Sequence, residues 1–140
     1  MGLFSKLFGN GGSRPKTASL PPGVTAREVI SIAVQRARDE IGGNCATLEV
    51  TANPRLWAQI MAGTFNCSYP YREDPGLLFP ALFGSDLVAH LDDFNPNGYM
   101  MISLNQADAT VAADWLADYF TQVLALDLST VQLRLHMEEL

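Results

Sequence analysis

Cysteine is scarce in this chain of 140 residues, where Cys45 and Cys67 are the only two. They form no CxxC pair, and the start of the chain has no signal peptide. We therefore expect a reducing, cytoplasmic compartment and two buried free thiols. A disulfide between neighbouring strands is the alternative, because both residues lie in apolar sequence that is typical of strands.

Long apolar runs and glycine-rich phosphate loops are also absent. The apolar stretch in residues 1–8 is too short for a signal peptide or a membrane span. Gly9 to Gly12 precede neither a strand nor a Lys-Ser/Thr pair, so they do not resemble a phosphate-binding loop. Neither of the two histidines, His90 and His136, belongs to a Ser/His/Asp or Cys/His arrangement. We expect no catalytic residue, no metal and no cofactor.

Basic residues are nearly missing from the second half. Residues 73–140 hold eleven acids against Arg134 alone, whereas residues 1–72 hold eight basic residues and four acids. An acidic half repels phosphate backbones, so a nucleic-acid partner is not expected. A basic protein surface is the natural complement, and the alternative is that the acids only keep a small protein in solution.

Two groups of acids resemble parts of known sites, one in the loop at residues 93–98 and one beside His90. The loop Asp93-Phe-Asn95-Pro-Asn97-Gly98 matches the first half of a calcium loop, but Leu104 occupies the position of the completing glutamate. A plain hairpin turn explains the same residues. His90 together with Asp92 or Asp93 would indicate a small enzyme only if a deep pocket held them.

The chain divides into a tail and one domain. Residues 1–23 are basic and rich in Gly, Ser and Pro, which predicts a flexible tail and linker. Leu3, Phe4, Leu7 and Phe8 would share one face of a helix. Such a short segment orders only against a membrane, a partner or its own domain, and otherwise frays. Residues 24–140 are expected to form a single α+β domain.

The apolar periodicity predicts the elements of that domain. Helices are expected from Thr25 to Ile41, closed by Gly42-Gly43, and from Asp108 to Leu126. Strands are expected at Cys45–Ala52, Leu56–Tyr69, Tyr99–Leu104 and Thr130–His136, the first with Thr47 and Glu49 on a wet side. Leu77 to Phe83 reads as an edge or loop, and residues 85–91 fit a helix or a strand.

The order α-β-β-β-α-β predicts an antiparallel sheet of four to five strands with two helices on one face. Candidate contact residues follow from this placement. Asp114 and Asp118 lie one turn apart on the polar side of the second helix. Tyr69, Tyr71, Trp57 and Phe94 fall at strand ends or turns, where aromatic rings either anchor a partner or fill the end of the core.

Size, acidic pI and element order resemble bacterial type III secretion chaperones and the related YbjN-like proteins. The resemblance covers residues 24–140, from Thr25-Ala-Arg-Glu28 to the strand Thr130–His136, and fits a stand-alone YbjN-like module best. It implies a non-enzymatic module that binds an extended segment of a partner protein, usually as a dimer.

The sequence thus predicts a chaperone-like or adaptor-like protein-binding module with an acidic surface. Its expected contact residues are Asp114, Asp118, Tyr69, Tyr71, Leu3, Phe4, Leu7 and Phe8. The tail could also touch a membrane weakly, because its few basic residues are attracted to anionic lipid. The alternatives are an immunity-type inhibitor of a basic partner and, behind it, a small enzyme.

Overall fold

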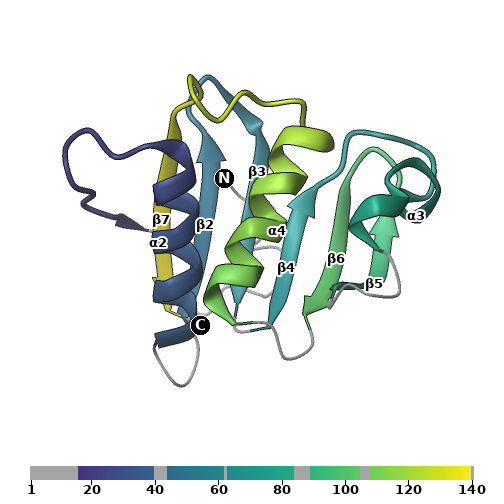
Figure 1. Cartoon of the computed structure of the whole chain (residues 1–140), viewed down its shortest axis with the longest axis horizontal. Helices are drawn as coiled ribbons and strands as arrows, with labels where there is room; N and C mark the ends of the chain where they lie inside the picture. Colours follow the sequence, from purple (N-terminus) through teal and green to yellow (C-terminus); the bar gives the residue numbers. More distant parts are fainter. Residues whose placement is uncertain (1–15, 40–43, 62, 84–88, 105–107, 140) are drawn as a thin grey trace.

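The computed structural model describes residues 16–39, 44–61, 63–83, 89–104 and 108–139. Along the chain, groups of strands are separated by helices (Figure 1). The elements are β1 (Lys16–Thr17), α2 (Ala26–Asp39), β2 (Asn44–Val50), β3 (Asn53–Met61), β4 (Thr64–Ser68), α3 (Pro75–Leu78), η1 (Pro80–Leu82), β5 (Ala89–Asn95), β6 (Tyr99–Leu104), α4 (Ala109–Gln122) and β7 (Leu133–Glu139).

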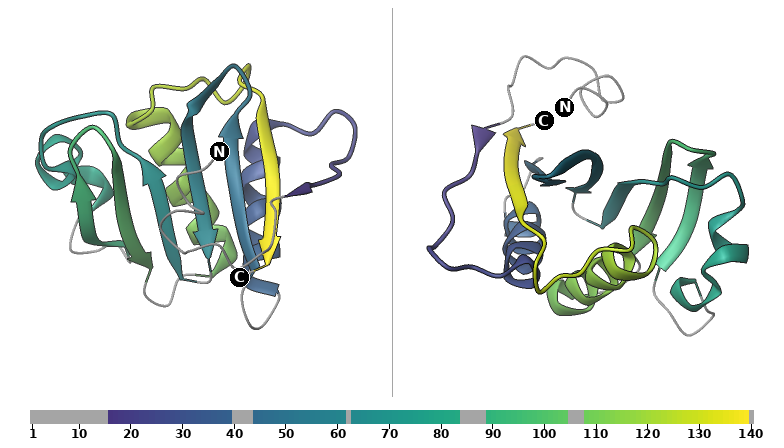
Figure 2. Two further views of the ribbon diagram at one scale, coloured as in Figure 1. Left: turned by 180° about the vertical axis from the view of Figure 1, so that it is seen from behind. Right: turned by 90° about the horizontal axis from the view of Figure 1, so that it is seen from above.

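The fold is α+β, as predicted. All the described strands join one antiparallel sheet in the order β1-β7-β2-β3-β4-β6-β5, and α2 and α4 cover the same face of it (Figures 1 and 2). The sheet has seven strands, counting the two-residue β1, instead of four to five. A third helix, α3, adds to the two that were predicted.

The predicted long strand Leu56–Tyr69 is wrong, because a hairpin divides it. Met61 of β3 pairs with Thr64 of β4, and Gly63 between them has a φ of +79°. Only glycine adopts this left-handed conformation without strain, so the residue marks a turn here. The hairpin brings Phe65 and Cys67 onto the same face as Ala58 and Ile60, and Trp57 lies on the other face. Asn53 and Pro54, a dipeptide typical of turns, are the first two residues of β3.

Both long helices begin where the sequence predicts. Thr25 and Glu28 form a capping box, in which each backbone N–H donates to the other side chain at 3.1 Å. Asp108 caps α4 by accepting from the Val111 N–H at 2.8 Å. Val111 is apolar but exposed, because the buried side of this helix consists of Ala112, Ala113, Trp115, Leu116, Ala117, Tyr119 and Phe120. The Gly42-Gly43 stop lies outside the described residues.

The connection predicted as an edge or loop at 77–83 is instead helical. Asp74 starts α3 by accepting from the Gly76 N–H at 2.7 Å, and Pro80 opens η1. The Trp115 indole N–H donates to the Leu82 carbonyl at 3.0 Å and ties this connection to α4. Of the ambiguous residues 85–91, those from Ala89 onward are strand, and residues 84–88 lie outside the described part.

The wet side predicted for the strand 45–52 is a second error. Thr47 and Glu49 are only 1% and 5% exposed. They lie on the face of the sheet that α2 and α4 do not cover, which is seen from behind in Figure 2. Alternation alone separates the two faces of a strand but does not say whether the polar one meets water.

Candidate functional site

The predicted contact residues lie in different places. Asp114 and Asp118 are exposed on α4, and Asp114 Oδ1 lies 3.7 Å from Arg27 Nη1 of α2. Tyr69 is buried, and its hydroxyl donates to the Glu73 carbonyl. The half-buried Tyr71 donates to the Val123 carbonyl at 2.8 Å, just after α4. These two tyrosines therefore pack against the core, whereas Leu3, Phe4, Leu7 and Phe8 lie outside the described residues.

The other aromatic candidates also pack inside the fold. The Phe94 ring meets the Tyr69 ring edge-on, with ring centres 6.1 Å apart. Trp57 is buried on the face of the sheet that lacks long helices. Aromatic rings in these positions contribute packing, which is one of the two roles that the sequence allowed.

The histidine and acidic loop candidates sit on the β5–β6 hairpin. His90 is exposed, and its Nε2 lies 3.8 Å from Asp92 Oδ1. It lines neither the pocket at the edge of β7 nor the smaller pocket between α2 and α4. The calcium-like loop is the tight turn between β5 and β6, with Asn97 at a φ of 55° and the Gly98 N–H donating to the Asn95 carbonyl. Asx residues adopt such conformations readily, as the hairpin interpretation requires.

A polar face forms on the side of the sheet opposite α2 and α4. We define it by nine residues of β2, β3, β4 and β7: Thr47, Glu49, Trp57, Gln59, Asn66, Ser68, Arg134, His136 and Glu138. In register, His136, Thr47, Gln59 and Asn66 stand side by side on four successive strands. The arrangement is a row of polar side chains across the centre of the sheet.

The middle of this row holds an incompletely paired amide couple. Asn66 Nδ2 donates to Gln59 Oε1 at 3.3 Å. Among the described residues, the buried atoms Gln59 Nε2, Asn66 Oδ1 and Glu138 Oε2 have no hydrogen-bond partner. Buried polar atoms are nearly always paired, because an unmade hydrogen bond costs about 1–3 kcal/mol. One free donor and one free acceptor side by side can bind a peptide group.

An ion-pair cluster occupies the β7 end of the polar face. Arg134 Nη1 lies 3.4 Å from Glu49 Oε1, and His136 Nε2 lies 3.9 Å from the same oxygen. Thr17 Oγ1 of β1 lies 3.4 Å from His136 Nδ1. Burial lowers the pKa of His136, and the Glu49 carboxylate opposes this effect only in part. The imidazole is therefore neutral near pH 7.

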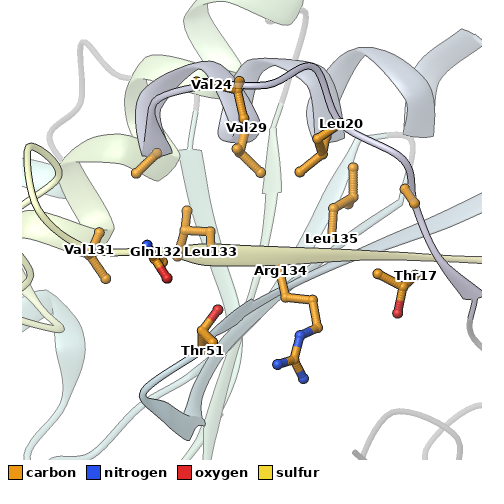
Figure 3. A pocket seen from close by; sticks show the side chains of 13 residues that line it. Thr17, Leu20, Val24, Val29, Thr51, Val131, Gln132, Leu133, Arg134 and Leu135 are labelled. Atoms are coloured by element: carbon orange, nitrogen blue, oxygen red, sulfur yellow. The ribbon is translucent and has the colours of Figure 1, made fainter.

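A pocket of about 340 Å³ opens at the outer edge of β7 (Figure 3). Leu20, Val24, Val29, Leu133 and Leu135 line it on the side of α2, and Thr17, Thr51 and Arg134 line it on the side of the polar face. It forms because the chain pairs with β7 at Lys16 and Thr17 and then departs toward α2. Cysteine, histidine and carboxylate side chains are absent from its described lining.

The β7 backbone is unpaired at this pocket. The Ala18 N–H donates to the Leu135 carbonyl, so Leu135 presents its backbone groups away from β2. The Thr51 N–H donates to the Gln132 carbonyl, which therefore points toward β2. Because these directions alternate along an antiparallel strand, the N–H and carbonyl of Leu133 also point outward. No described residue hydrogen-bonds to them there.

Both cysteines are free and buried. Burial raises the pKa of Cys45 to about 12 and raises that of Cys67 as well. Their thiols are therefore protonated at neutral pH and poor nucleophiles. In the described part of the chain, no group of three His, Cys, Asp or Glu side chains is arranged to hold a metal ion. None of the described helices is long and apolar enough to cross a membrane.

Comparisons of the chain with models of known protein families, with curated proteins and with solved structures found no match.

Little in the amino-acid sequence indicates either the polar face or the β7-edge pocket. Thr47, Gln59 and Asn66 are uncharged polar residues within apolar runs, and only the strand register aligns them in a row. A polar residue in an apolar strand is a usable signal, because burial requires a partner. The pocket depends on where the chain leaves β7, and the glycine- and proline-rich composition of residues 9–23 did not indicate this position.

Proposed function

We propose that the protein is a binding module that holds an extended segment of a partner polypeptide along the outer edge of β7. The observation that carries this proposal is the outward N–H and carbonyl of Leu133, which open onto the pocket in Figure 3. An unpaired strand edge is a template for one more strand, and added main-chain hydrogen bonds supply affinity.

The β7-edge pocket has one apolar side and one polar side, and this also supports an extended strand as its occupant. Side chains of an added strand alternate between the faces of the sheet. One would enter the apolar side at Leu20, Val24 and Val29, and the next would lie beside Thr51 and Arg134. The partner segment is therefore expected to alternate apolar and polar residues over a few positions.

The resemblance to YbjN-like proteins and type III secretion chaperones agrees with this class of function. It rests on the order of helices and strands in residues 24–140. Under the same proposal the protein works in the cytoplasm as an adaptor or chaperone, and a homodimer would present two such edges. The net charge of −6 would attract a partner that carries basic residues near the bound segment.

The exposed acids Asp114 and Asp118 on α4 favour a second candidate, an inhibitor that covers a basic protein surface. The two candidates differ in how they respond to salt and to changes in backbone hydrogen bonding. Binding through exposed charges weakens steeply with ionic strength, whereas strand addition depends on backbone groups.

The experiment is a random peptide library screened on the whole protein, followed by calorimetric titration of a selected peptide. N-methylation of the peptide, one position at a time, tests the strand directly. We expect methylation to weaken the affinity of the peptide about tenfold or more at every second position only. This factor corresponds to the loss of one hydrogen bond. Strand addition would be contradicted if the effect of methylation on affinity did not alternate along the peptide, or if the library contained no binders.

Variants of β7 provide the matched protein-side test. Leu133→Pro removes the outward N–H without removing a β2–β7 bond, whereas Leu133→Ala trims the side chain and keeps that N–H. We expect Leu133→Pro to bind the peptide at least about tenfold more weakly than Leu133→Ala. Circular dichroism would verify that both variants fold, and Asp114→Lys with Asp118→Lys serves as the control that tests the charge-driven alternative.

A further inference from the structure

The polar face combines deep burial with missing partners. Gln59 and Asn66 are 1% and 0% exposed, although α2 and α4 both lie on the opposite face (Figure 2). In the part of the chain that the structure describes, the buried atoms of the polar face without a partner are one donor, Gln59 Nε2, and two acceptors, Asn66 Oδ1 and Glu138 Oε2. A polypeptide that lies across this face could satisfy the first two with one carbonyl and one N–H.

We propose that the occupant is the chain's own N-terminal segment, residues 1–15, which docks across the polar face. The segment continues directly from β1, whose Thr17 already contacts His136 at the border of this face. Gln59 and Asn66 stand three and four strands away from β1, which is about 14–19 Å at the usual strand spacing. Fifteen extended residues span up to about 50 Å, so residues 3–8 can reach both side chains.

Charge and side-chain type agree with this occupant. Residues 1–15 contain Lys6 and Arg14 and no acid. The polar face contains the buried carboxylates of Glu49 and Glu138, and within the described residues Arg134 pairs with Glu49 but not with Glu138. A cation from the segment would supply the missing partner of Glu138, since an unpaired buried charge is costly.

The apolar residues of the segment also have a matching surface. Leu3, Phe4, Leu7 and Phe8 are four large apolar side chains, and so short a segment does not hold a helix alone in water. By register, Met101 lies beside Asn66 and Met61 lies beside Thr64, and both methionines are half-buried. With the Trp57 ring, they provide flexible apolar side chains next to the amide couple.

The test uses a spin label at Ser5→Cys in the full chain. The native thiols Cys45 and Cys67 are buried and poorly reactive, so the label attaches at the introduced residue alone. Nuclear magnetic resonance then follows the side-chain amides of Gln59 and Asn66. We expect both signals to be broadened strongly, and the amides of exposed α4 residues such as Asp118 to be unaffected.

The matched control carries the same label together with Leu3→Ser, Phe4→Ser, Leu7→Ser and Phe8→Ser. Loss of the broadening in this variant would support docking by the apolar side chains. Equal broadening in both proteins, or broadening limited to β1 and β7, would overturn the proposal. Broadening of an isotope-labelled, spin-free chain mixed with a spin-labelled unenriched chain would also overturn it, because the segment would then belong to a second copy.

This docking does not depend on peptide binding at the β7 edge. A library without binders leaves the broadening at Gln59 unchanged, and loss of the broadening leaves the Leu133 edge unpaired. The two experiments therefore fail separately.

Discussion

Arg134 and Glu49 face each other across the β2–β7 pair, with Nη1 and Oε1 3.4 Å apart. The guanidinium side chain is 44% exposed, whereas the carboxylate side chain is only 7% exposed. The same arginine lines the β7-edge pocket, so one side chain borders both surfaces described above. Arg134 is also the single lysine or arginine in residues 73–140.

Replacement of Arg134 should therefore destabilise the fold more than its exposure suggests. Arg134→Met leaves the Glu49 carboxylate buried beside a neutral histidine, and we expect a loss of about 1–3 kcal/mol of unfolding free energy. Urea denaturation measures it. Glu49→Gln combined with Arg134→Met should cost less than the sum of the single changes, because the lone charge is gone. Strict additivity would show that the pair contributes nothing.

Mild acid should also destabilise the protein through His136. Its folded-state pKa is lowered from the model-peptide value of 6.5, so the unfolded chain binds the proton more readily. The stability is complete above pH 6.5 and falls as the pH drops below that value, until the folded imidazole is protonated as well. Melting temperatures measured between about pH 7.5 and about pH 5.5 should show this fall.

His136→Gln is the control for this pH dependence. Glu49 and Arg134 remain beside the substituted side chain, so any pH dependence that they cause is retained. The fall in melting temperature should become shallower in the variant. An unchanged slope would assign the effect to other groups.

The hydroxyl of Tyr119 should matter more to stability than the exposed ion pair that joins α4 to α2. It donates to the Ser68 carbonyl at 2.7 Å in the buried core. Tyr119→Phe leaves that carbonyl without this donor, at an expected cost of about 1–2 kcal/mol. Asp114→Ala removes a pair with Arg27 between exposed side chains, and its expected cost is below about 0.5 kcal/mol. Equilibrium denaturation of both variants measures these two losses of unfolding free energy. A larger loss in Asp114→Ala than in Tyr119→Phe would show that surface charges hold α4 in place.

The two thiols should resist modification in the folded protein. With a pKa of about 12, only about one Cys45 side chain in ten thousand is ionised near pH 8. Ellman's reagent should react with both cysteines in urea and with neither in native buffer over the same time. Rapid native labelling would show that the strands β2 or β4 open locally.

The sequence predicted best those elements that a local pattern defines. The capping box at Thr25 and the alternating residues from Tyr99 to Leu104 each carry their own signal, and both are found as predicted. The break between β3 and β4 was missed because apolar residues continue on both sides of Gly63. A single glycine indicates a turn only when its backbone angle is known.

The polar face could not be predicted, because its character arises from pairing between distant residues. Thr47 and His136 are neighbours only through the β2–β7 register, which brings the end of the chain beside the first long strand. Sequence alternation predicted that Thr47 and Glu49 share a side, and this is correct. It could not predict their burial, which depends on the whole sheet.

The other boundary of the sheet has a different construction. Among the described strands β5 pairs with β6 alone, and an irregularity between Leu91 and Asp93 interrupts its register beside the exposed Asp92 and Asp93. Bulges and charges at a border strand discourage intermolecular association. Growth of the sheet into fibrils requires that both edges of the sheet can pair with another molecule. In the described sheet only the β7 edge can do so. Successive molecules therefore cannot join their sheets edge to edge. A partner strand bound at β7 is thus prevented from starting an aggregate.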